Sequence, residues 1–257
     1  MIDDIKKFKY KFYDIRRMGL IKSKRKGTTG AGYTFECLIG KQEDQECKPD
    51  FGNIEIKTRN AFTKSPMNLF TFNPTSLNGG YAIQDIFDNY NYEKENTKEI
   101  IFSRNVYHCK SFEKNSYSFN LFIDFKENRL YLTSLKDDIY KNKICYWDLD
   151  KLKEKVENKL KLLAVVKAYP YTRNNETYFK YLKMNLYKLI NFERFIELIL
   201  SDKIFISISL KQKENRDKKK YIDNHGCAFR IVNDAFNELF QEIDYSNQAL
   251  DLLEKTQ

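Results

Sequence analysis

The segment NIEIKT, residues 53–58, constrains the fold most strongly because apolar and charged side chains alternate along it. Successive side chains of a strand point to opposite faces. Ile54 and Ile56 are therefore expected on one face, and Glu55 and Lys57 on the other. The segment is predicted to be a strand that carries two charged side chains on the same face.

Other parts of the chain show either strand or helix patterns. Strands are predicted where β-branched and aromatic residues are dense, at 69–72, 117–124, 129–134, 161–169, 176–189 and 203–210, with a helix as the alternative for 176–189. Helices are predicted where apolar residues recur at helical spacing, in the first twenty residues, at 33–40, 148–160 and 191–202, and after Asn233. A charged loop is expected at 211–220. The pattern predicts an α/β (mixed) fold in which helices cover a mixed β-sheet.

Charge and composition narrow the class of partner. The 257 residues include 45 Lys and Arg against 36 Asp and Glu, and the formal net charge of +9 favours a polyanion such as nucleic acid. The alternative is that the positive charge reflects a lysine-rich composition alone and not a polyanionic partner. The charged first residues do not resemble a secretory signal, and the longest uncharged stretch, 65–84, is broken by proline and glycine. Five cysteines without a CxxC pair indicate reduced thiols. We therefore expect a cytoplasmic protein without a membrane segment.

Residues 22–32, KSKRKGTTGAG, combine four cations with three glycines. Backbone amides of a glycine-rich loop and a helix N-terminus bind phosphate, and cations add affinity that does not depend on sequence. Lys24, Arg25 and Lys26 are therefore candidate DNA contacts, with a solvated basic turn as the alternative. Glu36, on the predicted helix 33–40, is a further carboxylate close in sequence to the predicted strand.

Glu-x-Lys triplets occur at 46–48, 55–57 and 157–159. Only the second lies on a predicted strand and follows a Pro-Asp pair, so a turn at 51–52 would bring Asp50 beside Glu55. Two converging carboxylates need a cation between them, and Mg²⁺ takes one or two carboxylates together with water and a phosphate. Lys57 would position or deprotonate a water and offset charge on a phosphate. A Glu–Lys pair on an exposed strand face is the alternative.

Two separated signatures resemble a known family. The segments KRKGTTGAGYTFECLIG (24–40) and KPDFGNIEIKT (48–58) resemble the N-terminal signature of MvaI/BcnI-type type II restriction endonucleases and, more distantly, the MutH mismatch-repair nicking enzyme of the PD-(D/E)xK nucleases. The segment DNHGCAFRI (223–231) resembles the C-terminal signature of the same family. The two signatures occur in the family's order and bracket most of the chain.

The resemblance implies a catalytic site. Asp50 and Glu55 correspond to the metal-binding carboxylates, and the main-chain carbonyl of Ile56 is expected to complete the inner metal shell. Lys57 corresponds to the catalytic lysine, and Glu36 to the family's helix glutamate. The implied cofactor is Mg²⁺, with Mn²⁺ as a substitute and Ca²⁺ binding without supporting cleavage.

The resemblance also implies a base-reading segment in the major groove. Asp223, Asn224, His225 and Arg230 fall on it, and their donors and acceptors suit guanine and cytosine edges. Lys218, Lys219 and Lys220 are expected to contact backbone phosphates, with a solvated loop as the alternative. The segment departs from the family pattern, because Asp223-Asn224 stands where His-Asp is expected. The preceding ISISL (206–210) also lacks an arginine associated with base reading.

The implied architecture is one endonuclease chain, 1–257, with a PD-(D/E)xK core and two lobes around a DNA cleft. The catalytic lobe is expected at about 1–110 plus part of the middle strands, and the recognition lobe is expected to include about 200–232. The implied activity is Mg²⁺-dependent hydrolysis of double-stranded DNA at a short near-palindromic site. We expect a monomer in the prokaryotic cytoplasm, with a cognate methyltransferase in the same system but no stable complex with it.

Two other functions stay open at this point. A MutH-like repair nickase would cut one strand and depend on partner proteins. A DNA-binding protein with a vestigial nuclease centre would bind DNA without cutting it, although Asp50, Glu55 and Lys57 are all present.

Overall fold

The computed structural model describes residues 2–41, 48–113, 116–136 and 140–244. The chain divides into two compact units, each built from separate stretches of sequence. The first comprises 1–64, 155–191 and 237–257, and the second comprises 65–154 and 192–236. Residues 65–110, which the sequence interpretation placed with the catalytic lobe, belong to the second unit.

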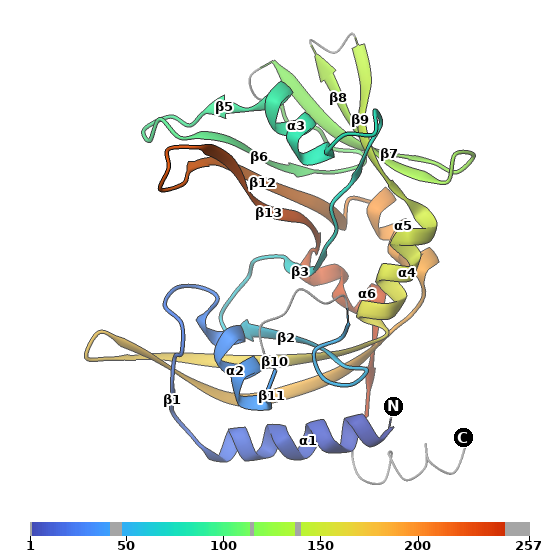
Figure 1. Ribbon diagram of the computed structural model, residues 1–257. Coiled ribbons are helices and arrows are strands. Elements are labelled where there is room, and N and C mark those ends of the chain that lie inside the picture. The colour runs from blue at the N-terminus through green and yellow to red at the C-terminus, as the bar shows by residue number, and fades with distance from the viewer. Residues whose placement is uncertain (1, 42–47, 114–115, 137–139, 245–257) are drawn as a thin grey trace. The chain divides into compact units, whose positions relative to one another are not determined.

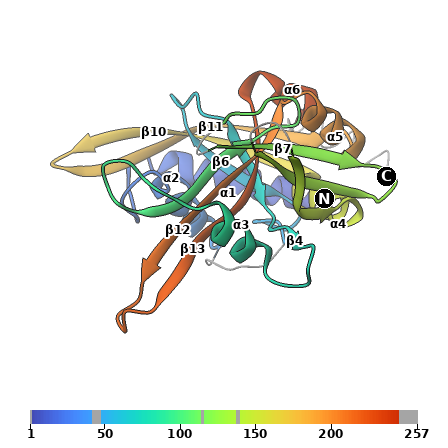
Figure 2. The same cartoon turned by 90° about the horizontal axis from the view of Figure 1, so that it is seen from above.

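The first unit contains a mixed five-stranded sheet (Figure 1). Its strands run in the order β1 (Ile21–Lys22), β11 (Glu176–Leu189), β10 (Leu162–Arg173) and β2 (Glu55–Asn60), and β14 (Phe240–Ile243) also pairs with β11. The pairing of β10 with β2 is parallel and the other pairings are antiparallel. The long β10–β11 hairpin is visible in both views (Figures 1 and 2).

Two helices, α1 (Ile2–Arg17) and α2 (Gly30–Ile39), pack with one face of this sheet. The shared core buries apolar side chains that recur at helical spacing in the helices and alternate along the strands. Its members include Phe8, Phe12, Phe35, Ile54, Ile56, Ala164, Val166, Met184 and Leu186. Because Ile54 and Ile56 face this core, the intervening Glu55 and the following Lys57 lie on the other face of β2. The alternation in the sequence therefore sets the orientation of the strand.

The second unit contains two antiparallel sheets (Figure 1). One has the order β3 (Met67–Thr71), β13 (Lys220–Ile231), β12 (Ile204–Glu214), β6 (Ile100–Val106) and β5 (Tyr92–Glu93). The other has the order β4 (Thr75–Ser76), β9 (Tyr140–Asp148), β8 (Arg129–Lys136) and β7 (Tyr117–Asp124). Helices α3 (Ala82–Tyr90) and α5 (Phe192–Leu200) belong to this unit, and α4 (Leu149–Leu160) crosses the boundary between the units in sequence.

Aromatic contacts join the two sheets of the second unit. The rings of Trp147 in β9 and Phe229 in β13 meet edge to face with centroids 5.8 Å apart, and those of Phe102 and Phe119 meet at 5.3 Å. The Trp147 indole N–H donates to the Phe72 carbonyl at 2.8 Å, which satisfies its only donor inside the core. These contacts explain why the β-rich middle of the chain is also rich in aromatic residues.

The structure confirms the mixed α/β class and most of the expected elements, including a strand at 55–60 and helices at 149–160 and 192–200. The expected loop at 211–220 is wrong, because β12 extends to Glu214 and β13 begins at Lys220. Only 215–219 form the turn, where the Asn215 side chain accepts hydrogen bonds from the backbone of Asp217 and Lys219.

The helix expected after Asn233 is only partly right. A 3-10 turn (η1, Asn233–Ala235) leads into the short α6 (Phe236–Leu239), and the chain then enters β14. The four described cysteines, Cys37, Cys109, Cys145 and Cys227, are free thiols. Among the described residues, no helix is long and apolar enough to cross a membrane.

Candidate active site

A tight turn brings Asp50 back to the start of β2. Phe51 and Ile54 exchange backbone hydrogen bonds of 2.9 and 2.8 Å, and Gly52 between them has a φ of 55°. The backbone N–H of Ile56 then donates to Asp50 Oδ2 at 2.8 Å. This is the turn expected from the Phe51-Gly52 pair, and it fixes one oxygen of Asp50 beside the strand that carries Glu55.

Glu55 is a buried carboxylate, 4% exposed, and both of its oxygens contact lysine. Lys57 Nζ donates to Oε1 at 2.7 Å, and Lys159 Nζ donates to Oε2 at 3.1 Å. Lys159 also donates to the main-chain carbonyl of Lys48 at 2.8 Å. A buried carboxylate requires such compensation, because desolvation of an isolated charge costs several kcal/mol.

A third lysine completes the cluster. Lys41 forms an ion pair with Asp50 Oδ1, and the side chains of both residues are largely buried. Asp50 and Glu55 are therefore surrounded by the ammonium groups of Lys41, Lys57 and Lys159 within the first unit. The second Glu-x-Lys triplet lies at the centre of this cluster, and the lysine of the third triplet reaches into it. Of the first triplet, Glu46 and Cys47 lie outside the described residues.

The chemistry of these donors fits a hard divalent cation. Two carboxylates supply oxygen ligands, and lysine ammonium groups contact three of their four oxygens. Within the described part of the chain, no group of three or more His, Cys, Asp and Glu side chains is placed to hold a metal. A closed thiolate or imidazole site of the zinc type is therefore not formed there. Two carboxylates match Mg²⁺, which usually retains waters and takes a substrate phosphate.

The basic glycine loop is tied to the first turns of α2. Lys24 N donates to Thr34 Oγ1 at 2.9 Å, and the Arg25 guanidinium stacks 3.7 Å from the centre of the Tyr33 ring. These contacts fix the backbone of the loop, and the side chains of Lys24 and Lys26 are exposed to solvent. Glu36 lies on α2, one helical turn after Gly32. A role for Glu36 in the catalytic site stays a prediction.

The expected base-reading residues lie on β13, in the second unit. Asp223 forms an ion pair with Lys213 across the hairpin, and the hydrogen bond from Lys213 lowers the pKa of Asp223. His225 Nε2 lies 3.5 Å from Asp223 Oδ2. Asn224 Oδ1 accepts from Gly226 N at 2.7 Å, so this side chain supports the turn in which Gly226 has a φ of 81°.

Arg230 is half-buried, and within the described structure its Nε has no hydrogen-bond partner. Leaving such a buried donor unpaired is energetically costly. Lys218, Lys219 and Lys220 lie in and beside the exposed turn of the β12–β13 hairpin, where Lys218 has a φ of 60°.

Comparison with known proteins decides the family. The family model described as the MvaI/BcnI restriction endonuclease family matches residues 9–240. This chain belongs to that family. A solved structure of restriction endonuclease MvaI with cognate DNA is 30% identical and has a TM-score of 0.85, with 95% of this chain and 98% of that chain covered. MvaI in the absence of DNA is also 30% identical, with a TM-score of 0.57 and coverage of 91% and 94%. A search of curated proteins found no match.

The chain is therefore a sequence-specific type II restriction endonuclease, a site-specific enzyme that cleaves DNA. Restriction endonucleases of this family generally use divalent metal ions. The cluster of Asp50, Glu55 and their lysines is the part of the described chain whose chemistry suits that requirement. The more distant relation to MutH is not part of this identification.

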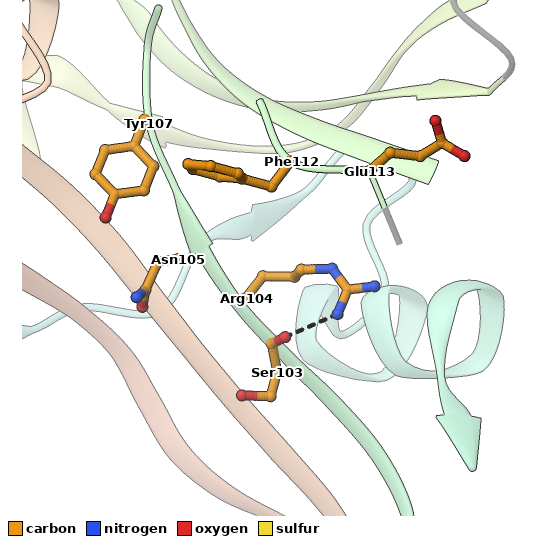
Figure 3. Close-up of a pocket in the computed structure, with 6 residues that line it drawn as sticks. All are labelled: Ser103, Arg104, Asn105, Tyr107, Phe112 and Glu113. Atoms are coloured by element: carbon orange, nitrogen blue, oxygen red, sulfur yellow. Dashed lines mark hydrogen bonds between the residues drawn. The ribbon is translucent and has the colours of Figure 1, made fainter. Parts of the chain in front are cut away.

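Sequence reasoning did not single out the polar residues on the strands next to β13. Ala228 of β13 lies in register with Ser207 of β12, and Ser207 lies in register with Asn105 of β6. Two open pockets lie along these strands, with volumes of about 380 and 450 Å³. Figure 3 shows the first pocket, where the Tyr107 and Phe112 rings lie close together and Arg104 donates to the Ser103 carbonyl at 2.8 Å. The second pocket includes Ser103, Ser209, Lys211 and His225.

Sequence reasoning also missed Lys41 and Lys159 as partners of Asp50 and Glu55. Lys159 had a weak signal, because it ends one of the three Glu-x-Lys triplets, but that triplet lies on a helix and gave no reason to join it to β2. Pairing over such a distance in the chain depends on the fold and cannot be inferred from local periodicity.

Proposed function

We propose that this endonuclease hydrolyses phosphodiester bonds of double-stranded DNA at a short near-palindromic site, with Mg²⁺ and a PD-(D/E)xK core. The observation that carries the proposal is the arrangement at β2. Asp50, which precedes β2, is held by the Ile56 N–H at 2.8 Å, and on β2 itself Glu55 contacts Lys57 at 2.7 Å. Two oriented carboxylates and a lysine supply both a cation site and a positive group for a phosphate.

In this proposal each residue has a distinct role. Asp50 and Glu55, with the Ile56 carbonyl, would hold Mg²⁺, which when bound supplies Lewis acidity at the scissile phosphate. Lys57 orients the attacking water and offsets negative charge that develops on the phosphate. The Ile56 N–H keeps the Asp50 carboxylate oriented. Glu36 is proposed as a further carboxylate on α2. Mn²⁺ is the expected substitute, and Ca²⁺ is expected to bind without supporting cleavage.

Base recognition is proposed for the β13 segment. Arg230 suits guanine O6 and N7, Asp223 suits cytosine N4, and Asn224 and His225 complete the set. The Arg230 side chain is half-buried, and its buried Nε has no partner among the described residues. Lys24, Arg25, Lys26 and Lys218–Lys220 are proposed to contact backbone phosphates. The first unit, which holds Asp50, Glu55 and Lys57, is proposed as the catalytic lobe, and the second unit, which holds β13, is proposed as the recognition lobe.

We further propose that the enzyme acts as a monomer in the prokaryotic cytoplasm. A cognate methyltransferase would protect host DNA without forming a stable complex with it. This arrangement follows from the restriction activity, because an unprotected host genome carrying the site would be cut.

Digestion of phage DNA tests the proposal. The protein with Mg²⁺ should produce discrete bands, and sequencing the fragment ends should give one short near-palindromic site. Asp50→Ala should abolish the bands, because it removes a cation ligand. Undiminished cutting by this variant would refute the site assignment.

The form of the plasmid after digestion tests whether both DNA strands are cut, as the proposal requires. A restriction enzyme converts supercoiled plasmid to linear product, whereas a MutH-like nickase alone stops at the open circle. A protein with a vestigial nuclease centre would bind the plasmid and leave it supercoiled at every Mg²⁺ concentration.

A further inference from the structure

Three cations lie side by side across the sheet of the first unit. In the strand register, Arg59 of β2 pairs with Lys167 of β10, and Lys167 pairs with Lys183 of β11. Neighbouring strands are about 4.8 Å apart, so the three side chains start close together on one face. Like charges directly opposite each other destabilise a sheet, which makes a row of three unusual unless an anion offsets it.

This row continues the face that carries the catalytic strand residues. Glu55, Lys57 and Arg59 are alternate residues of β2 and share a face, and their register partners on β10 are Leu163, Val165 and Lys167. Arg59 lies two residues beyond Lys57, or about 6.6 Å along the strand. One strand of duplex DNA rises by about 3.4 Å per nucleotide, so the row is one or two nucleotide steps from the position of Lys57.

The two lysines of the row are poorly compensated by the protein. Lys167 and Lys183 make no ion pair or hydrogen bond within the part of the chain that the structure describes. Burial, followed by the nearby charges of Arg59 and Lys183, lowers the pKa of Lys167. A β-bulge falls between Lys167 and Ala168, and bulges often redirect side chains next to active sites.

We propose that Arg59, Lys167 and Lys183 form a binding site for backbone phosphates of the DNA strand next to the scissile phosphate. The proposal rests on the proposed function, since it takes Lys57 to mark the scissile position. The occupant is a phosphodiester because the row offers three positive donors, and none of its three members is an acidic group that would repel an anion. Such contacts position the substrate without reading its sequence.

Salt dependence of DNA binding provides the test. Binding of two duplexes of unrelated sequence is measured in EDTA over a range of KCl concentrations, for the wild type, Lys167→Gln and Lys183→Gln. Each lost phosphate contact should reduce the slope of log K against log salt by about 0.9. Affinity should fall by the same factor for both duplexes. Lys188→Gln is the matched control, because it lies on β11 five residues from Lys183 and therefore on the opposite face.

An unchanged slope in both variants would overturn the proposal, as would a loss confined to one of the two duplexes, which would indicate base reading. Thermal unfolding checks that the variants fold. Both should melt no lower than the wild type, because each substitution removes repulsion between like charges. Lys183 is exposed, so Lys183→Gln still tests the site if Lys167→Gln fails to fold.

Cleavage of phage DNA by the same wild-type preparation distinguishes a failure of the phosphate-site proposal from a failure of the proposed nuclease function. If the wild type cuts DNA and the variants have unchanged slopes, the phosphate-site proposal is refuted and the nuclease proposal is not. If the slopes fall as expected but the wild type does not cut with Mg²⁺, the phosphate row stands and the nuclease proposal fails.

Discussion

Lys159 donates to Glu55 Oε2 at 3.1 Å, although the two residues lie 104 positions apart in the chain. The same ammonium donates to the carbonyl of Lys48 at 2.8 Å. Lys159 therefore joins the end of α4 to both the segment before Asp50 and the strand that carries Glu55. Lys159 thus holds one oxygen of the Glu55 carboxylate, and Lys57 contacts the other oxygen.

Lys159→Met should lower the free energy of unfolding by about 2 kcal/mol, because hydrogen bonds to charged groups contribute about 1.5–3 kcal/mol and Glu55 is buried. Urea unfolding followed by circular dichroism measures the change. In a double-mutant cycle with Glu55→Gln, the coupling between the two sites should exceed about 1 kcal/mol. Lys151→Met, on the exposed side of the same helix, is the control. A coupling near zero would show that Lys159 does not support Glu55.

Gly30→Ala should disturb the basic loop, whereas Gly32→Ala should be tolerated. A Cβ on Gly30 would lie 2.6 Å from the Arg25 carbonyl oxygen and 2.6 Å from Ser23 Oγ, while a Cβ on Gly32 would make only an ordinary contact of 3.7 Å with Glu36. Overpacking of this kind costs about 1–3 kcal/mol. The displaced Arg25 and its neighbouring lysines should then bind DNA more weakly. Equal stability and DNA affinity in the two variants, measured by urea unfolding and fluorescence anisotropy, would contradict this account of the loop.

Lys213→Met should raise the pKa of Asp223 toward its ordinary value, because the hydrogen bond from Lys213 is the main cause of the lowered pKa. A lowered pKa in the folded protein stabilises it above the unfolded pKa, and this contribution is lost as pH falls through the folded pKa. Carboxyl NMR titration follows Asp223 directly. Lys220→Met, at the exposed end of β13, should leave the titration unchanged. An Asp223 pKa that does not move in Lys213→Met would show that the ion pair is absent in solution.

The sequence predicted those parts of the fold that depend on local patterns. The alternation around Glu55 sets the face of β2, and the Phe51-Gly52 pair predicted the turn that returns Asp50. The loop expected at 211–220 was wrong because cross-strand pairs such as Lys213 with Asp223 extend the hairpin through a charged segment. Lys159 could not be assigned, because its contact with Glu55 depends on how β2, β10 and α4 assemble.

The most direct test of the central claim is single-turnover cleavage of supercoiled plasmid by Lys57→Ala with saturating Mg²⁺. Lys57 is the residue through which β2 is proposed to act on the phosphate, and its ammonium lies 2.7 Å from Glu55. Loss of one positioned electrostatic group typically costs about 10²–10³ in rate. The account predicts a loss of at least about 100-fold, with DNA binding in EDTA reduced only slightly. Cleavage at the wild-type rate would contradict it.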